Sequence, residues 1–131
     1  MASSGFSFPK KEKLCSQKVI ETLFASGHSF IKYPLRVVFM IQEDQTDTPV
    51  KVLVSVSKRR FKRAYKRNLL KRRIREAYRL NKYTLFPLLE KNSVNIAIAF
   101  VYLPTEILPF SEIEKTAKAT LESLITKLSL E

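Results

Sequence analysis

The sequence predicts one α+β domain, a sandwich of helices on a small mixed sheet, in the order α-β-β-α-β-α. A further short strand can be accommodated in the loops. Three observations support this prediction. The length of 131 residues suits a single domain. An apolar share of 45% is enough for a hydrophobic core. Strand-sized apolar runs alternate with segments of helical period, and the sequence has no internal repeat or linker that would divide it.

The N-terminal part of the chain predicts an arm followed by a helix. Residues 1–13 are polar and basic, which favours an extended arm at the start of the single domain 1–131. In residues 16–26 the apolar side chains recur at helical spacing. Gly27 follows directly and is a typical helix C-cap. We therefore expect a short helix that ends at Gly27.

Three segments are predicted to be strands. Residues 35–41 form a short apolar run. In residues 50–57 Val alternates with other side chains, the pattern of a half-buried strand. Because only the polar turn 43–49 separates these two segments, we expect them to pair antiparallel. Residues 94–102 place large apolar side chains on one face and smaller ones on the other, which predicts a third strand.

Two more helices are expected, one before and one after the third strand. Residues 64–83 contain neither Gly nor Pro and are rich in Leu, Lys and Arg, which favours a helix. Ser111, with Glu114 three residues further on, has the pattern of a capping box. Apolar residues then recur at helical spacing, so a closing amphipathic helix is expected from Ser111 onward.

The positive charge is concentrated in one segment. The net charge is +12, from 24 basic and 12 acidic residues. Residues 58–82 contain thirteen Lys or Arg and a single acid, Glu76, so this segment carries the whole net charge. Such a concentration is typical of a surface that binds a polyanion.

The basic helix is predicted to have two distinct faces. At about 100° per residue, one stripe is formed by Leu70, Ile74, Ala77 and Asn81, with Tyr78 at its edge, and we expect it to face the core. The opposite sector contains Asn68, Lys71, Arg72, Arg75, Arg79 and Lys82. Like charges at i and i+4 destabilise a helix. A one-sign face rich in Arg is therefore interpreted as an RNA-binding surface, since guanidinium groups bind phosphate bidentately and stack on bases.

Residues 66–79 resemble the RNR signature of the ribonuclease P protein component family. The strand that ends at Ser57 and the helix that ends at Gly27 are also similar to family features, and the resemblance covers nearly the whole chain. Leu69 departs from it, because the family usually has Arg at this position of the motif.

The resemblance implies a fold with a left-handed βαβ crossover, against the usual right-handed rule. It implies that the chain is the protein subunit of ribonuclease P, which binds the catalytic RNA subunit through the RNR region. A cleft between the sheet and the first helix would hold the 5′ leader of precursor tRNA, which the holoenzyme removes. Magnesium ions held by the RNA would activate the attacking water, and the protein alone would bind no cofactor.

Residue chemistry and this resemblance together predict the binding residues. The RNA-binding set is Lys58, Arg59, Lys66, Arg67, Asn68, Lys71, Arg72, Arg75 and Arg79. The leader-binding set contains Phe24, Phe30 and Tyr33, because aromatic side chains near the cleft would stack on single-stranded bases. Ile20 is included because the resemblance gives it a position that is often aromatic in the family. The alternatives that stay open are a core role for Phe24 and a loop-anchor role for Phe30 and Tyr33. Phe39 is expected in the core instead.

The sequence offers no catalytic residue and no metal site. His28 is the only histidine and Cys15 the only cysteine, which excludes an intrachain disulfide and a zinc site built from the two. The acids Glu43, Asp44 and Asp47 are interpreted as a solvated turn. We therefore expect the chain alone to have no nuclease activity, since a nuclease needs clustered carboxylates or histidine.

Other partners are less compatible with the sequence. The apolar runs are too short to span a bilayer and no signal peptide is apparent, so a cytoplasmic protein is expected. A membrane-surface or DNA-binding helix is disfavoured, because the apolar stripe suits close packing and the cationic surface is unusually dense. The alternative that stays open is a non-catalytic RNA-binding ribosomal or assembly protein.

Overall fold

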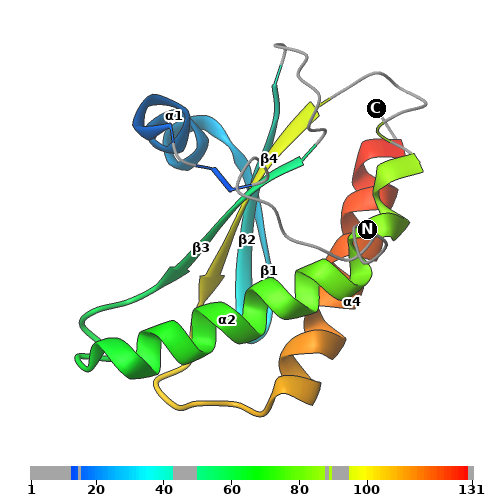
Figure 1. The fold of residues 1–131 in the computed structure, drawn as a ribbon. Coiled ribbons are helices and arrows are strands. Elements are labelled where there is room, and N and C mark those ends of the chain that lie inside the picture. The colour runs from blue at the N-terminus through cyan, green and yellow to red at the C-terminus, as the bar shows by residue number, and fades with distance from the viewer. Residues whose placement is uncertain (1–12, 15, 43–49, 88, 90–94, 130–131) are drawn as a thin grey trace, which may run out of the picture.

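A four-stranded mixed sheet in the order β1-β2-β4-β3 lies at the centre of the computed structural model, with α1 on one side and α2 and α4 on the other (Figure 1). The structure describes residues 13–14, 16–42, 50–87, 89 and 95–129. The elements are α1 (Gln17–Ser26), β1 (His28–Lys32), β2 (Leu35–Gln42), β3 (Val50–Val56), α2 (Ala64–Asn81), η3 (Lys82–Thr84), β4 (Asn95–Tyr102) and α4 (Phe110–Ser129).

The main core lies between one face of the sheet and the pair α2 and α4. Every second residue of a strand points to this face, which is why the four Val residues of β3 are buried and the residues between them are half-buried. Helix α2 adds four fully buried side chains, those of Leu70, Ile74, Ala77 and Tyr78. Helix α4 adds Ile113, Ala117, Leu121, Leu124 and Leu128. The predicted core stripe of the basic helix is thus confirmed for Leu70, Ile74, Ala77 and Tyr78, whereas Asn81 is half-buried.

A smaller cluster covers the other face of the sheet under α1. It contains Leu14, Leu23, Val38, Ala97 and Ala99, with Val19, Ile20, Met40 and Leu53 packed around them. The two Ala side chains of β4 make this face slimmer than the main core, as predicted.

Gly27 ends α1 as predicted, although its backbone is extended, with φ −72° and ψ 160°. Its N–H donates to the carbonyl oxygen of Leu23 at 2.8 Å. A Cβ atom at this position would lie 2.4 Å from that same oxygen. Glycine is therefore required here by close approach of the backbone.

The partner of β3 differs from the prediction. Instead of pairing antiparallel with β2, β3 pairs parallel with β4, for example Val54 with Phe100. Strand β4 is buried along almost its whole length, so it occupies an interior position between β2 and β3. Strand β2 pairs antiparallel with β4 and also with β1, which is the additional short strand. The β3-α2-β4 connection is the βαβ unit that the resemblance implies, and its hand stays a prediction.

The ends of two helices also differ from the prediction. Helix α4 begins at Phe110, and the carbonyl oxygen of Pro109 accepts from the N–H groups of Glu112 and Ile113. Ser111 therefore lies inside the first turn, and the Ser111–Glu114 capping box is wrong. The physical reason is the preceding loop, where the Tyr102 hydroxyl donates to the Glu106 carbonyl and accepts from the Leu108 N–H.

Helix α2 ends at Asn81, before the predicted Tyr83, and η3 follows. Lys82 was assigned to the cationic face, but only 1% of it is exposed. Its ammonium group lies 5.3 Å and 5.8 Å from the ring centres of Tyr83 and Phe86. The change from α to 3₁₀ geometry after Asn81 turns this side chain away from the outer face. The expected turn 43–49, Val94 at the start of the third strand and the arm before Lys13 lie outside the described residues.

Candidate RNA interface

The outer face of α2 presents the predicted cations to solvent because the opposite stripe is buried. Asn68 and Arg72 are exposed, and Lys71, Arg75 and Arg79 are half-buried. A period of 3.6 residues puts Leu70 and Ile74 against the core and these side chains on the other side. The sequence-based assignment of the two faces therefore holds for all five.

A shallow hollow of about 690 Å³ lies on this outer face. All of its lining residues come from α2: Tyr65, Asn68, Leu69, Arg72, Arg75, Glu76 and Arg79. Three guanidinium groups and one amide thus converge on one place, together with an aromatic ring and an aliphatic side chain. Of the residues lining it, Tyr65, Leu69 and Glu76 were not among the predicted site residues. Their signal was the spacing from Asn68 and Arg72, which puts Tyr65 on the same face.

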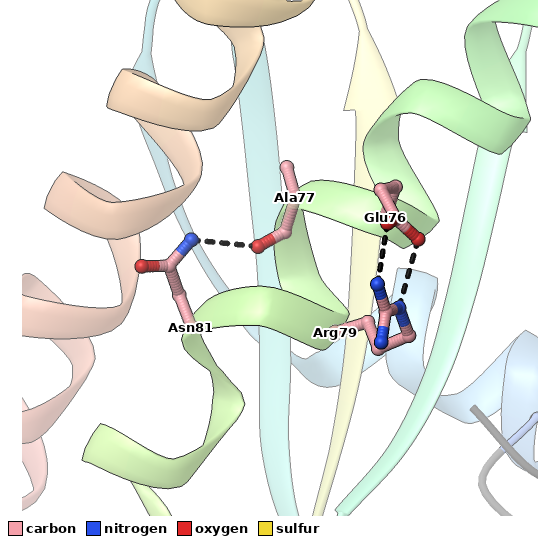
Figure 2. A network of polar contacts seen from close by, with 4 residues as sticks. All are labelled: Glu76, Ala77, Arg79 and Asn81. Carbon is pink, nitrogen blue, oxygen red and sulfur yellow. Dashed lines mark hydrogen bonds and ion pairs between the residues drawn. The ribbon is translucent and has the colours of Figure 1, made fainter. Parts of the chain in front are cut away.

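The single acid of the basic segment is paired within α2. The Arg79 Nε donates to Glu76 Oε1 at 2.8 Å, and its Nη2 to Oε2 at 2.5 Å (Figure 2). The hydrogen bond from Arg79 lowers the pKa of Glu76, and the same bond raises the pKa of Arg79. Asn81 lies on the other side of the helix, toward α4, and its amide donates to the Ala77 carbonyl at 2.8 Å. Glu76 therefore orients Arg79 at the rim of the hollow.

Arg67 has a different environment from the other predicted cations. Its Nη1 donates to the carbonyl oxygens of Phe61 and Lys62, at 2.7 Å and 2.9 Å. Phe61 is itself buried and packs on the ring of Tyr102, 6.0 Å between centres. Arg67 thus ties the segment before α2 to the helix, and its guanidinium faces the chain's own backbone.

Two further arginines bind backbone in the same way. Arg73 Nη1 donates to the Leu108 carbonyl at 2.7 Å, and Arg60 Nη1 donates to the Leu103 carbonyl. Both join the basic segment to the loop before α4. Part of the positive charge is therefore used to hold the interface in shape.

The segment before α2 forms a turn that presents Lys58 and Arg59. The hydroxyl oxygen of Ser57 accepts from the N–H groups of Arg59, at 3.1 Å, and Arg60, at 3.4 Å. Lys58 and Arg59 are exposed, and Lys66 lines a second hollow with the loop 105–107. These three predicted residues lie near the N-terminal end of α2, where the helix has no acidic residue in its first turn. The positive end of the helix dipole adds to their charge.

The four predicted leader-binding residues do not lie together. Ile20 and Phe24 are on α1, one turn apart, and 43% of Phe24 is exposed. Phe30 lies on the opposite face of the sheet, against Phe39 and under Lys127, whose Nζ is 5.2 Å from the ring centre. Tyr33 is in the β1–β2 turn and borders a hollow shared with α4.

The expectation that Phe30 and Tyr33 line the cleft beside α1 is therefore wrong. Phe30 pairs with Val37, and both side chains point to the main core because of the strand's alternation. Phe39 is in the core, as predicted.

The described residues also bear on metal binding and membrane spanning. In the described ranges no three His, Cys, Asp or Glu side chains gather as metal ligands. Cys15 and the acids Glu43, Asp44 and Asp47 lie outside those ranges. No helix within the described ranges has the length and apolar character needed to cross a bilayer.

The fold and the interface define a class, a small α+β protein with one basic helix arranged for a polyanion. A family model described as Ribonuclease P matches residues 8–125. The chain belongs to the ribonuclease P protein family.

Individual relatives agree with this assignment. The ribonuclease P protein component of Porphyromonas gingivalis (strain ATCC 33277) is 40% identical over 116 residues, which cover 88% of this chain and 85% of the relative. That of Chlorobium phaeobacteroides is 35% identical over 105 residues, covering 74% and 72%.

Solved structures share the fold. The RNase P protein of Staphylococcus aureus has a TM-score of 0.69 at 19% identity, covering 86% of this chain and 94% of that one. The Thermotoga maritima RNase P protein has a TM-score of 0.67 at 20% identity, covering 86% and 96%.

Proposed function

We propose that the chain is the protein component of ribonuclease P, which binds the catalytic RNA subunit and supports removal of the 5′ leader from precursor tRNA. The observation that carries the proposal is the outer face of α2, where the cations of the RNR-like segment converge opposite a buried stripe in a member of this family. The comparisons give no support to the alternative of a ribosomal or assembly protein.

The proposal assigns the cleavage chemistry, and the Mg²⁺ ions it requires, to the RNA. The acid nearest the cations supports this assignment, since Glu76 is hydrogen-bonded to Arg79 and is poorly placed to act as a base. The protein's part is electrostatic, because Arg and Lys that neutralise phosphates allow RNA strands to approach one another.

Contact with the leader is assigned to α1. Phe24 is exposed beside Ile20, which packs on the slim face of the sheet over Ala97 and Ala99. An accessible ring next to an apolar surface is suited to stacking on an unpaired base. The predicted contacts of Phe30 and Tyr33 are not part of the proposal.

Reconstitution tests the proposed function. The purified chain and its cognate catalytic RNA would be assayed on precursor tRNA at low Mg²⁺, with each component alone as a control. We expect leader removal to accelerate only when both are present. Arg72→Ala with Arg75→Ala should weaken this effect, whereas Lys115→Ala with Lys118→Ala removes the same charge from exposed positions on α4 and should not. A chain that leaves the RNA's cleavage rate unchanged would contradict the proposal.

A further inference from the structure

Tyr65 is an exposed aromatic residue on the cationic face of α2. It lies in the first turn of α2, and 63% of it is exposed. Leu69 follows one turn later, half-buried, and both residues line the hollow with Asn68 and Arg72. Among the residues that the structure describes, no ring and no cation is stacked on Tyr65.

Phosphate binding does not account for the apolar surface of these two side chains. The Tyr65 hydroxyl can donate to a phosphate oxygen, but phosphate binding uses neither the face of its ring nor the isobutyl group of Leu69. Residues i and i+4 of a helix lie one above the other, so Tyr65 and Leu69 form a continuous apolar strip. Asn68 and Arg72 line the same hollow beside this strip. An aromatic surface beside cations is the arrangement with which proteins hold unpaired bases.

We propose that this hollow binds one unstacked nucleobase of the RNA partner. The ring of Tyr65 stacks on a face of the base, and Leu69 contacts its edge. The Asn68 amide, which donates and accepts, bonds to polar groups of the base, and Arg72 binds the adjoining phosphate. The volume of about 690 Å³ is within the roughly 300–1,000 Å³ of small-ligand sites. This base-binding site rests on the proposed function in one respect, because that function identifies the partner as RNA.

The test compares two single-stranded probes with the same phosphates, a ten-residue adenylate RNA and an abasic strand of equal length. Binding is measured by fluorescence anisotropy. We expect Tyr65→Ala to weaken binding of the adenylate strand about 5- to 150-fold, the effect of losing one base stack. Binding of the abasic strand should be unchanged. Tyr65→Phe keeps the ring and should bind both probes like the wild type.

Controls separate a lost contact from a damaged helix. Tyr65→Leu keeps an apolar side chain suited to a helix but has no ring, so it should behave like Tyr65→Ala, with a wild-type melting temperature. Arg72→Ala should instead weaken both probes and reduce the dependence of binding on salt, since a single-strand phosphate contributes about −0.7 to the log–log slope.

Two results would overturn the base-binding site. One is equal affinity of Tyr65→Leu and wild type for the adenylate strand, and the other is an equal loss of affinity for both probes. Reconstituted cleavage is a separate measurement. If the wild-type protein fails to support leader removal, the proposed function is wrong, whatever the affinities for the two single-stranded probes. If cleavage is supported but the ringless variants bind normally, only the base site falls.

Discussion

Arg67 lies within the RNR-like segment, yet its guanidinium holds the chain's own backbone. Its bonds to the carbonyls of Phe61 and Lys62 fix the segment that leads into α2. Lys58 and Arg59 lie earlier in the same segment, so their positions depend on this contact. We therefore infer that Arg67 supports RNA binding by fixing the conformation of the segment that carries Lys58 and Arg59.

Replacement of Arg67 should therefore affect stability as well as binding. Arg67→Ala leaves two carbonyls without their charged donor, and we expect unfolding to become easier by about 1.5–3 kcal/mol, the range for hydrogen bonds to charged groups. Arg67→Lys keeps the charge but lacks the planar fork, so it should preserve the salt dependence of RNA binding and recover little of the stability. Denaturant unfolding and RNA titrations at several salt concentrations measure the two effects. An Arg67→Ala protein as stable as the wild type would show that this contact does not stabilise the fold.

Helix α2 separates two functions onto two faces, and substitutions should separate them too. Ile74→Ala leaves a cavity in a fully buried site, and we expect a loss of about 2–5 kcal/mol in the free energy of unfolding. Asn68→Ala removes an exposed amide, so stability should stay within about 0.5 kcal/mol. Thermal melts and titration of the catalytic RNA in the processing assay measure both.

The pattern of outcomes decides the orientation of the helix. Excess RNA should rescue Asn68→Ala, whose defect is in assembly, whereas Ile74→Ala should melt early in the absence of RNA. An early melt for Asn68→Ala, or a wild-type melt for Ile74→Ala, would contradict the assignment of the two faces.

The sequence predicted which face of each helix or strand is buried, but it did not predict which strands pair with each other. The spacing of Leu70, Ile74 and Ala77 dictates which side of α2 is buried, and alternation does the same for β3. Alternation does not say which strand lies beside β3, since a parallel and an antiparallel partner bury the same Val residues. The extra strand β1 was not assigned because four of its five residues are exposed.

The candidate site follows the same distinction. The cations of α2 were found because the helical period is local information. Phe30 and Tyr33 were placed near α1 because the sequence does not reveal which side of the sheet that helix covers. The internal role of Arg67 was also missed, since its partners are backbone carbonyls in a segment without regular structure.

In the whole molecule the charge is unevenly distributed, and this should make stability depend on its surroundings. Residues 58–82 carry all of the net charge of +12, and the ion pair between Arg79 and Glu76 neutralises one of these cations. Self-repulsion of this kind opposes folding and is relieved by counterions.

We therefore expect the melting temperature of the free protein to rise with moderate salt, and to rise more when RNA is added at low salt. In parallel, RNA affinity should fall steeply with salt, by about −0.9 in the log–log slope for each duplex phosphate neutralised. Calorimetry and binding titrations across a salt series test both trends. The Arg72→Ala, Arg75→Ala protein serves as the comparison and should show smaller changes in each. A melting temperature that is insensitive to salt would contradict the expectation that repulsion between these cations destabilises the fold.

The position of β4 has a consequence for how the protein is made. Strand β4 lies between β2 and β3 and supplies a hydrogen-bonded edge to each, although it is the last strand to be synthesised. A nascent chain that ends before Asn95 already contains the basic helix, but its two halves of the sheet have no strand to join them. The surface that α2 packs against is complete only after α4 has also left the ribosome, because α2 contacts both β3 and α4. The candidate RNA interface therefore acquires its geometry late in translation. An unfinished chain contains the basic residues but not the fold that arranges them.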